Sequence, residues 1–144
     1  MYQILHNDIF MTAVLAWLIA QILKFIFHLL KHKKLDLTRF VGSGGMPSSH
    51  SAFVMGISTA VGLKVGFDSA EYAIALCFAL VVMYDASGVR RAVGIQANIL
   101  NKMIRDLKEF KHIGEQSLKE LVGHTPFEVL IGAFLGIIIA NIVI

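Results

Sequence analysis

The segment Gly-Gly-Met-Pro-Ser-Ser-His-Ser, residues 44–51, stands directly before an apolar run at 53–65. This run alone is shorter than the roughly 20 residues that a membrane-crossing helix needs. It reaches spanning length only if the helix starts near Pro47, which places the serines and His50 at the headgroup level. Backbone N–H groups, hydroxyls and an imidazole at a helix start are groups with which proteins hold a phosphate. A helix start alone would explain Pro47 and one serine, but not the histidine.

The composition indicates that this helix belongs to a membrane protein. The chain has 144 residues, of which 56% are hydrophobic and 16% charged, and its mean hydropathy is +0.70. Soluble domains carry about 25% charged residues, and here the apolar residues come in blocks. We expect a single all-α domain, an integral membrane bundle of about four transmembrane helices with an amphipathic helix on the cytoplasmic side. The expected spans are 9–30, 47–66, 69–87 and 126–144, and the amphipathic helix covers about 88–110.

Basic residues are concentrated in two of the connections between these spans. They are Lys31, Lys33, Lys34 and Arg39, and then Arg90, Arg91, Lys102, Arg105, Lys108, Lys111 and Lys119. The positive-inside rule puts both segments in the cytoplasm, so we expect a plasma-membrane protein of bacterial type whose polar motif faces the cytoplasm. The charges flank apolar spans without an aromatic and basic surface, so anionic membrane lipids are expected partners and nucleic acids are not.

Two further groups of polar residues fall at the same end of the expected bundle. In the segment 84–91, Asp85 lies at membrane depth and Arg90 and Arg91 follow. The arginines could simply anchor the end of a span, or one could face the bundle, bind a phosphate and be held by Asp85. Lys24 in the first span has the same two readings: it could snorkel to the interface or face the site.

The third group is His124-Thr125-Pro126-Phe127-Glu128. Thr125 to Glu128 form a capping-box pattern, with Pro126 at the first helical position, so Glu128 could serve only as a cap. If Glu128 also bonds the ring of His124, it stabilises the imidazolium and makes the histidine a usable nucleophile. Magnesium would need more carboxylates and zinc a tighter cluster, so we expect no metal site and no cofactor.

Three blocks of the sequence together resemble one known family. The blocks are Gly-Gly-Met-Pro-Ser-Ser-His-Ser-Ala (44–52), Tyr-Asp-Ala-Ser-Gly-Val-Arg-Arg (84–91) and Gly-His-Thr-Pro-Phe-Glu-Val (123–129). They resemble the divergent branch of the type 2 phosphatidic acid phosphatase superfamily, the acid phosphatase/vanadium-dependent haloperoxidase-related membrane proteins. The superfamily motif Pro-Ser-Gly-His is matched at 47–50 except for Ser49. The end of its last motif, His-x3-Asp, is matched by His124 and Glu128.

Two departures from the superfamily pattern concern phosphate ligands. Leu118 stands where the family has an arginine, so Arg90 or Arg91 would have to supply that charge. The first motif, Lys-x6-Arg-Pro, has no clean match near Arg39, and Lys24 is an alternative lysine.

The resemblance implies a metal-independent phosphatase acting on a lipid phosphate or prenyl diphosphate in two steps. His124 would form a phosphohistidine, oriented by Glu128, while His50 would protonate the leaving oxygen. The phosphoryl oxygens would be held by a set of hydroxyls, amides and cations. These are Ser48, Ser49, Gly44, Gly45, Arg90 or Arg91, and Lys24.

Two other functions remain open at this point. A non-catalytic member could bind or transport anionic lipids or their headgroups with the same pocket, and the altered phosphate ligands favour this alternative. Vanadate-dependent halide oxidation would reuse the pocket, but no residue favours it over hydrolysis. We also expect a homodimer through glycine-bearing faces, because Gly62 with Gly66 and Gly132 with Gly136 have the small-xxx-small spacing of close helix contacts.

Overall fold

The computed structural model describes residues 2–33, 45–108 and 123–144. In these residues the chain is helical, with η1 (Tyr2–His6), α1 (Asp8–His32), α2 (Ser49–Val65), α3 (Ala70–Ser87), α4 (Val89–Lys108) and α5 (Pro126–Val143). The expected all-α membrane bundle is therefore confirmed. The part of the amphipathic helix expected beyond residue 108 lies outside the described residues.

Polar caps set where the helices begin. The side chains of Asn7, Ser48, Ser69 and Thr125 each accept a hydrogen bond from a backbone N–H group in the first turn of α1, α2, α3 and α5 respectively. Such caps satisfy N–H groups that have no partner within the helix. The boundaries that the sequence predicts at 69 and 126 follow directly from two of these caps.

α2 begins later than the sequence predicts. Its 17 residues start at Ser49, because Ser48 is the capping residue and lies outside the helix. Three stretches are long and apolar enough to cross a membrane: Asp8–Leu30, Ala70–Arg105 and Pro126–Val143. α2 is not among them. Where about four spanning helices were expected, the structure has three stretches of spanning length and the shorter helix α2.

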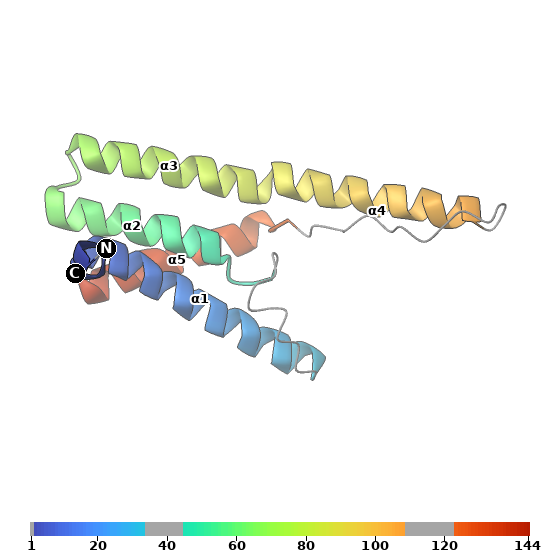
Figure 1. The fold of residues 1–144 in the computed structure, drawn as a ribbon, viewed down its shortest axis with the longest axis horizontal. Helices are drawn as coiled ribbons and strands as arrows, with labels where there is room; N and C mark the ends of the chain where they lie inside the picture. Colours follow the sequence, from blue (N-terminus) through green and yellow to red (C-terminus); the bar gives the residue numbers. More distant parts are fainter. Residues whose placement is uncertain (1, 34–44, 109–122) are drawn as a thin grey trace.

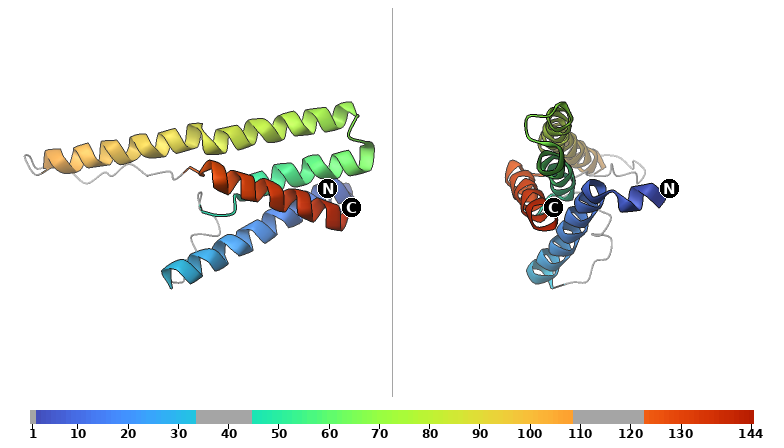
Figure 2. Two further views of the ribbon diagram at one scale, coloured as in Figure 1. Left: turned by 180° about the vertical axis from the view of Figure 1, so that it is seen from behind. Right: turned by 90° about the vertical axis from the view of Figure 1, so that its left-hand side faces the viewer.

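α2 is the central helix of the bundle. It contacts α1, α3 and α5, and Figures 1 and 2 show these three helices arranged around it. The buried apolar side chains are nearly all alanines, including Ala16, Ala20 and Ala52 in the core between α1 and α2. Small side chains let helix backbones approach closely, which is the usual basis of helix association in membranes.

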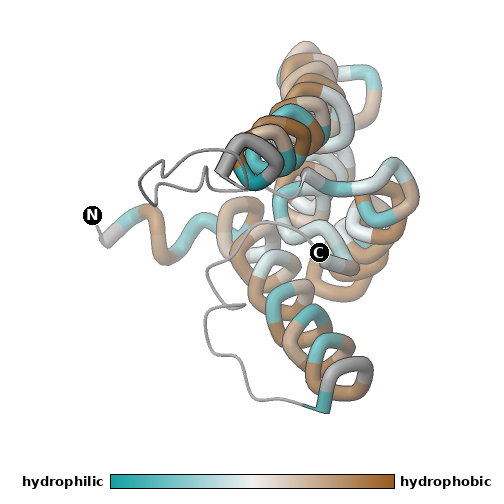
Figure 3. The backbone as a smooth tube through the Cα atoms, turned by 90° about the vertical axis from the view of Figure 1, so that its right-hand side faces the viewer, coloured by the Kyte–Doolittle hydropathy of each residue, from teal (hydrophilic) through white to brown (hydrophobic). Residues whose placement is uncertain are grey.

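α4 continues the direction of α3 and extends past the rest of the bundle (Figure 1). It contacts α3 and no other described helix. Apolar side chains are exposed along it, among them Val93, Ile99 and Met103. From the end where α2 and α5 begin, hydrophilic positions recur along one side of α1 and along α4 (Figure 3). The amphipathic pattern of α4 is thus present, and its placement at the membrane surface stays a prediction.

Candidate functional site

Backbone hydrogen bonds join three distant segments at one end of the bundle, which we call the site end. The N–H group of Ser48 donates to the carbonyl oxygen of Glu128 over 3.1 Å, and that of His124 donates to the carbonyl oxygen of Ala86 over 3.1 Å. The first bond ties the start of α2 to the start of α5. The second ties the residue before Thr125 to the last turn of α3. The three polar groups that the sequence places at one end therefore do meet.

The two predicted catalytic histidines are neighbours at the site end. The ring centroids of His50 and His124 lie 6.3 Å apart, with an interplanar angle of 64°. His50 stands in the first turn of α2 and is exposed, whereas His124 is only 3% exposed. One ring is accessible from outside and the other is enclosed by protein, so a ligand that contacts both rings would be partly removed from water.

Glu128 contacts both the backbone and the histidine through the same oxygen. Its Oε2 accepts a hydrogen bond from the N–H group of Thr125 over 2.9 Å, which completes a capping box with the hydroxyl of Thr125. The same oxygen lies 3.4 Å from Nδ1 of His124, an ion-pair contact if the ring is protonated. The two readings of Glu128, as a cap and as the partner of His124, are geometrically compatible.

The imidazole ring of His124 is buried, and the hydrogen-bonding capacity of its two nitrogens is unused within the described residues. Neither ring nitrogen has a hydrogen-bond partner among the described residues. Because the carboxylate of Glu128 lies beside Nδ1, Nε2 is the ring nitrogen left to meet a ligand. Burial lowers the pKa of His124 below its ordinary value of 6.5, and the positive charge of Lys24 lowers it further, against the opposing effect of Glu128. The ring is therefore neutral at neutral pH and its nitrogen lone pair is free to react.

Lys24 is the buried cation of the site. Its side chain comes from the second half of α1 and is 4% exposed, and Nζ donates to Oγ of Ser49 over 3.3 Å. Gly45 passes close to it with a positive φ of 88°. A Cβ atom at Gly45 would lie 3.3 Å from Cγ of Lys24, so glycine keeps the loop close to the lysine stem. Of the two readings of Lys24, the structure excludes snorkelling to the surface.

The two serines of the motif differ in what they contact. Ser48 is fully buried, and its hydroxyl oxygen accepts from the N–H group of Ser51 over 3.3 Å and from the hydroxyl of Ser51 over 2.9 Å. Ser49 instead faces Lys24. Ser48 therefore caps α2, and Ser49 is the hydroxyl beside the cation. Sequence reasoning did not single out Ser51 as a contributor, although it stands in the quoted motif.

The remaining predicted site residues lie at the border of this cluster. Asp85 is half-buried in the last turn of α3, next to the carbonyl that accepts from His124, and Arg91 is exposed on α4. Gly44 and the side chain of Arg90 lie outside the described part of the chain. The described charged and titratable groups that act on His124 are Lys24, Glu128 and His50. In the part of the chain that the structure describes, no three His, Cys, Asp or Glu side chains are grouped to hold a metal ion.

Comparisons with known proteins point to one family. The family model described as "Divergent PAP2 family" matches residues 5–139 of the chain. The uncharacterized membrane protein YuiD of Bacillus subtilis (strain 168) is 38% identical over an alignment of 148 positions, which covers 95% of this chain and 94% of that protein. No solved structure matches the chain.

Proposed function

This chain belongs to the divergent PAP2 family of membrane proteins, and from that premise we propose that it is a phosphatase that hydrolyses a lipid phosphate or prenyl diphosphate through a phosphohistidine. The observation that carries the proposal is the pair of imidazoles 6.3 Å apart. A nucleophile approaches phosphorus at roughly 3 Å, and a general acid reaches the leaving oxygen over roughly 3 Å. Rings whose centroids lie this close are near neighbours, so a phosphoryl group placed beside the pair can be reached by both imidazoles.

In the first step Nε2 of His124 supplies the electron pair that attacks phosphorus. The bond between phosphorus and the leaving oxygen breaks, and that oxygen takes a proton from the protonated ring of His50. The low pKa of His124 supports this assignment, because a nucleophilic nitrogen must be unprotonated. The contact of Nδ1 with Glu128 supports it too, since the carboxylate stabilises the positive charge that the ring acquires.

In the second step water replaces the histidine on phosphorus. The now neutral His50 takes a proton from water, the hydroxide oxygen attacks phosphorus, and the phosphorus–nitrogen bond breaks. The electron pair returns to Nε2 of His124, and inorganic phosphate leaves. The sum of the two steps is hydrolysis of a phosphate ester, and both histidines regain their starting states.

Lys24 and Ser49 are the best-placed groups to hold the phosphoryl oxygens. The buried ammonium of Lys24 already donates to the hydroxyl of Ser49, and a buried cation gains from a dianionic ligand because the surroundings screen the charges poorly. In this proposal Lys24 takes the role that the superfamily gives to an arginine, and Gly45 contributes its backbone N–H group. Ser48, Gly44, Arg90 and Arg91 stay proposed phosphate ligands, and Asp85 a proposed support.

Phosphate release by the purified full-length protein tests the proposal. Wild-type protein in detergent should release phosphate from dodecyl phosphate, while His124→Ala and His50→Ala should lower the rate by a factor on the order of 100 or more. Quenching during turnover with alkaline detergent should trap a base-stable, acid-labile phosphorylated protein in the wild type but not in His124→Ala. Binding of dodecyl phosphate without any release would favour the alternative, a non-catalytic binder of anionic lipids. A rate indifferent to both substitutions would remove the mechanism.

A further inference from the structure

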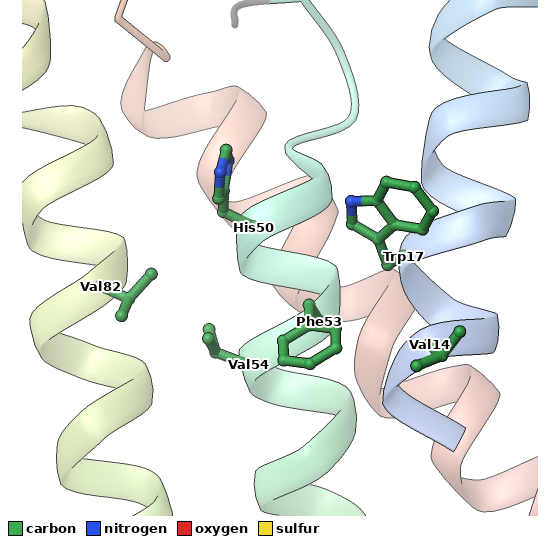
Figure 4. Close-up of a pocket in the computed structure, with 6 residues that line it drawn as sticks. All are labelled: Val14, Trp17, His50, Phe53, Val54 and Val82. Atoms are coloured by element: carbon green, nitrogen blue, oxygen red, sulfur yellow. The ribbon is translucent and has the colours of Figure 1, made fainter. Parts of the chain in front are cut away.

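An apolar hollow of about 390 Å³ lies against the face of α2 between α1 and α3. We call it the α2 groove. Figure 4 shows its six lining residues, which come from three helices. They are Val14 and Trp17 of α1, His50, Phe53 and Val54 of α2, and Val82 of α3. His50 is the only residue of the six with a titratable side chain.

The α2 groove is continuous with the histidine pair. His50 lines the groove and its ring also neighbours His124. Phe53 and Val54 follow three and four residues after His50, so they stand on the same face about one helical turn, or roughly 5 Å, further along α2. A ligand that runs from His124 along this face passes from a polar end to apolar walls within one turn. This sequence of polar and apolar surroundings matches an amphiphile that carries a phosphate at one end and a hydrocarbon chain at the other.

We propose that the α2 groove binds the single alkyl or prenyl chain of an amphiphile whose phosphate lies beside the rings of His50 and His124. The inference rests on the proposed function, for which it names the substrate class. The volume supports one chain: about 390 Å³ lies near the lower end of the roughly 300–1,000 Å³ typical of small-molecule sites. α1 and α3 both contact α2 and supply lining residues, so they bound the groove on two sides.

Trp17 allows binding in the groove to be measured without catalysis. The chain contains one tryptophan, so its intrinsic tryptophan fluorescence comes from a groove residue. Dodecyl phosphate with bromine atoms on its chain should quench this fluorescence in a saturable way, because bromine quenches only at close range. Brominated dodecanol, which has the same chain without the phosphate, should need a concentration about tenfold higher, equivalent to about 1.4 kcal/mol.

Two adjacent residues of α3 provide a matched pair of variants. Val82 lines the groove, whereas Val81 is 61% exposed and does not. Val82→Phe places a ring in the groove and should weaken quenching by brominated dodecyl phosphate about tenfold. Val81→Phe makes the same change on the outer side of α3 and should bind like the wild type. Neither variant adds a tryptophan, so the signal stays with Trp17.

Three results would overturn the inference. Equal quenching by the brominated phosphate and alcohol would mean that the groove takes any lipid chain. Equal behaviour of Val82→Phe and Val81→Phe would mean that the chain binds elsewhere. Competition by two-chain phosphatidic acid as strong as that by unlabelled dodecyl phosphate would contradict the single-chain commitment.

Phosphate release, measured on the same samples, separates this inference from the proposed function. Phosphate-dependent quenching that is weakened in Val82→Phe, without any release, would support the groove and overturn the phosphatase. Release that does not depend on chain length, with an undisturbed rate in Val82→Phe, would support the phosphatase and overturn the groove.

Discussion

Glu128 is the residue whose single carboxylate serves two neighbours. One of its oxygens accepts from the backbone of Thr125 and also lies 3.4 Å from His124. The first contact stabilises the start of α5, and the second bears on the reactivity of the imidazole. A substitution that keeps the shape and removes the charge can separate the two roles, since an amide oxygen can still cap a helix.

We predict that Glu128→Gln leaves stability nearly unchanged and lowers the rate of phosphate release by a factor on the order of 100. The glutamine oxygen still accepts from Thr125, but it no longer stabilises a positive ring at His124. The matched control is Thr125→Ala, which removes the N-cap, costs about 1 kcal/mol of stability and keeps the rate of the folded protein. Thermal unfolding in detergent and initial rates measure both. If both variants lose activity equally, Glu128 acts only as a cap.

The pH dependence of the reaction should report the burial of His124. The ring must be unprotonated to attack, so activity falls as the pH drops through its pKa. Burial and the charge of Lys24 lower the pKa of His124, and the acid limb of kcat/KM should therefore lie below pH 6.5, the ordinary value for histidine.

We predict that Lys24→Gln moves this acid limb to higher pH. Removing the positive charge removes one of the causes that lower the pKa of His124, so the ring is protonated at a higher pH than in the wild type. The rate at neutral pH should also fall at least tenfold, because a phosphate ligand is lost. Profiles of kcat/KM against pH for dodecyl phosphate check the shift. An acid limb at the wild-type position would show that Lys24 does not act on His124.

At the scale of the helices, the closest packing is that of α5 on α2. A Cβ atom at Gly132 would meet the carbonyl oxygen of Ser48, and one at Gly136 would meet that of Ala52. These glycines are buried within the chain, so the expectation that they form a dimer face is wrong. Sequence spacing marks a close helix contact but does not say which helix makes it. A homodimer stays a prediction and would need other surfaces.

We predict that Gly132→Ala destabilises the protein and lowers activity together. The added methyl group overlaps the carbonyl of Ser48 and approaches Cβ of Ser51 to 3.0 Å, so α5 must move away from the start of α2. Overpacking of this kind costs about 1–3 kcal/mol. Gly94→Ala, in α4 outside this contact, should be neutral or stabilising by up to about 1 kcal/mol. Thermal unfolding in detergent distinguishes them, and an unchanged melting temperature for Gly132→Ala would contradict the packing.

At the scale of the whole molecule, the two ends of the bundle differ in chemistry. The site end carries the histidines and Lys24, and α4 with its exposed Arg91, Lys102 and Arg105 extends from it. Both termini lie at the other end (Figure 1). There the basic residue Lys64 is paired with Asp8 over 3.0 Å. This asymmetry supports the proposal that the site end faces the cytoplasm.

We predict that labelling of single cysteines in intact cells distinguishes the two ends. In a Cys77→Ala background, which removes the chain's one cysteine, Asp68→Cys should react with a membrane-impermeant maleimide added outside. Lys33→Cys should react only after the membrane is permeabilised. Both positions are exposed, Asp68 between α2 and α3 and Lys33 directly after α1, so burial does not bias the comparison. The reverse pattern would place the site outside.

Much of the fold could be predicted because its signals are local. The predicted start of the last span at 126 agrees with α5, and the predicted break between 87 and 88 agrees with the end of α3 at Ser87. Caps, glycines and blocks of apolar residues act within a few positions along the chain. The start of α2 was expected near Pro47 because a full span needs that length, and only the geometry shows that Ser48 is the cap and that α2 is shorter.

The sequence by itself determined that this is a helical membrane protein with polar groups at one end of its bundle, and that His50, His124 and Glu128 are the residues to consider. Only the tertiary structure decided that the two rings lie 6.3 Å apart, that Lys24 is the buried cation beside Ser49, and that an apolar groove begins at His50. The physical reason is that periodicity and capping specify each helix separately. Which side chains meet depends on how small residues let the helices pack against one another.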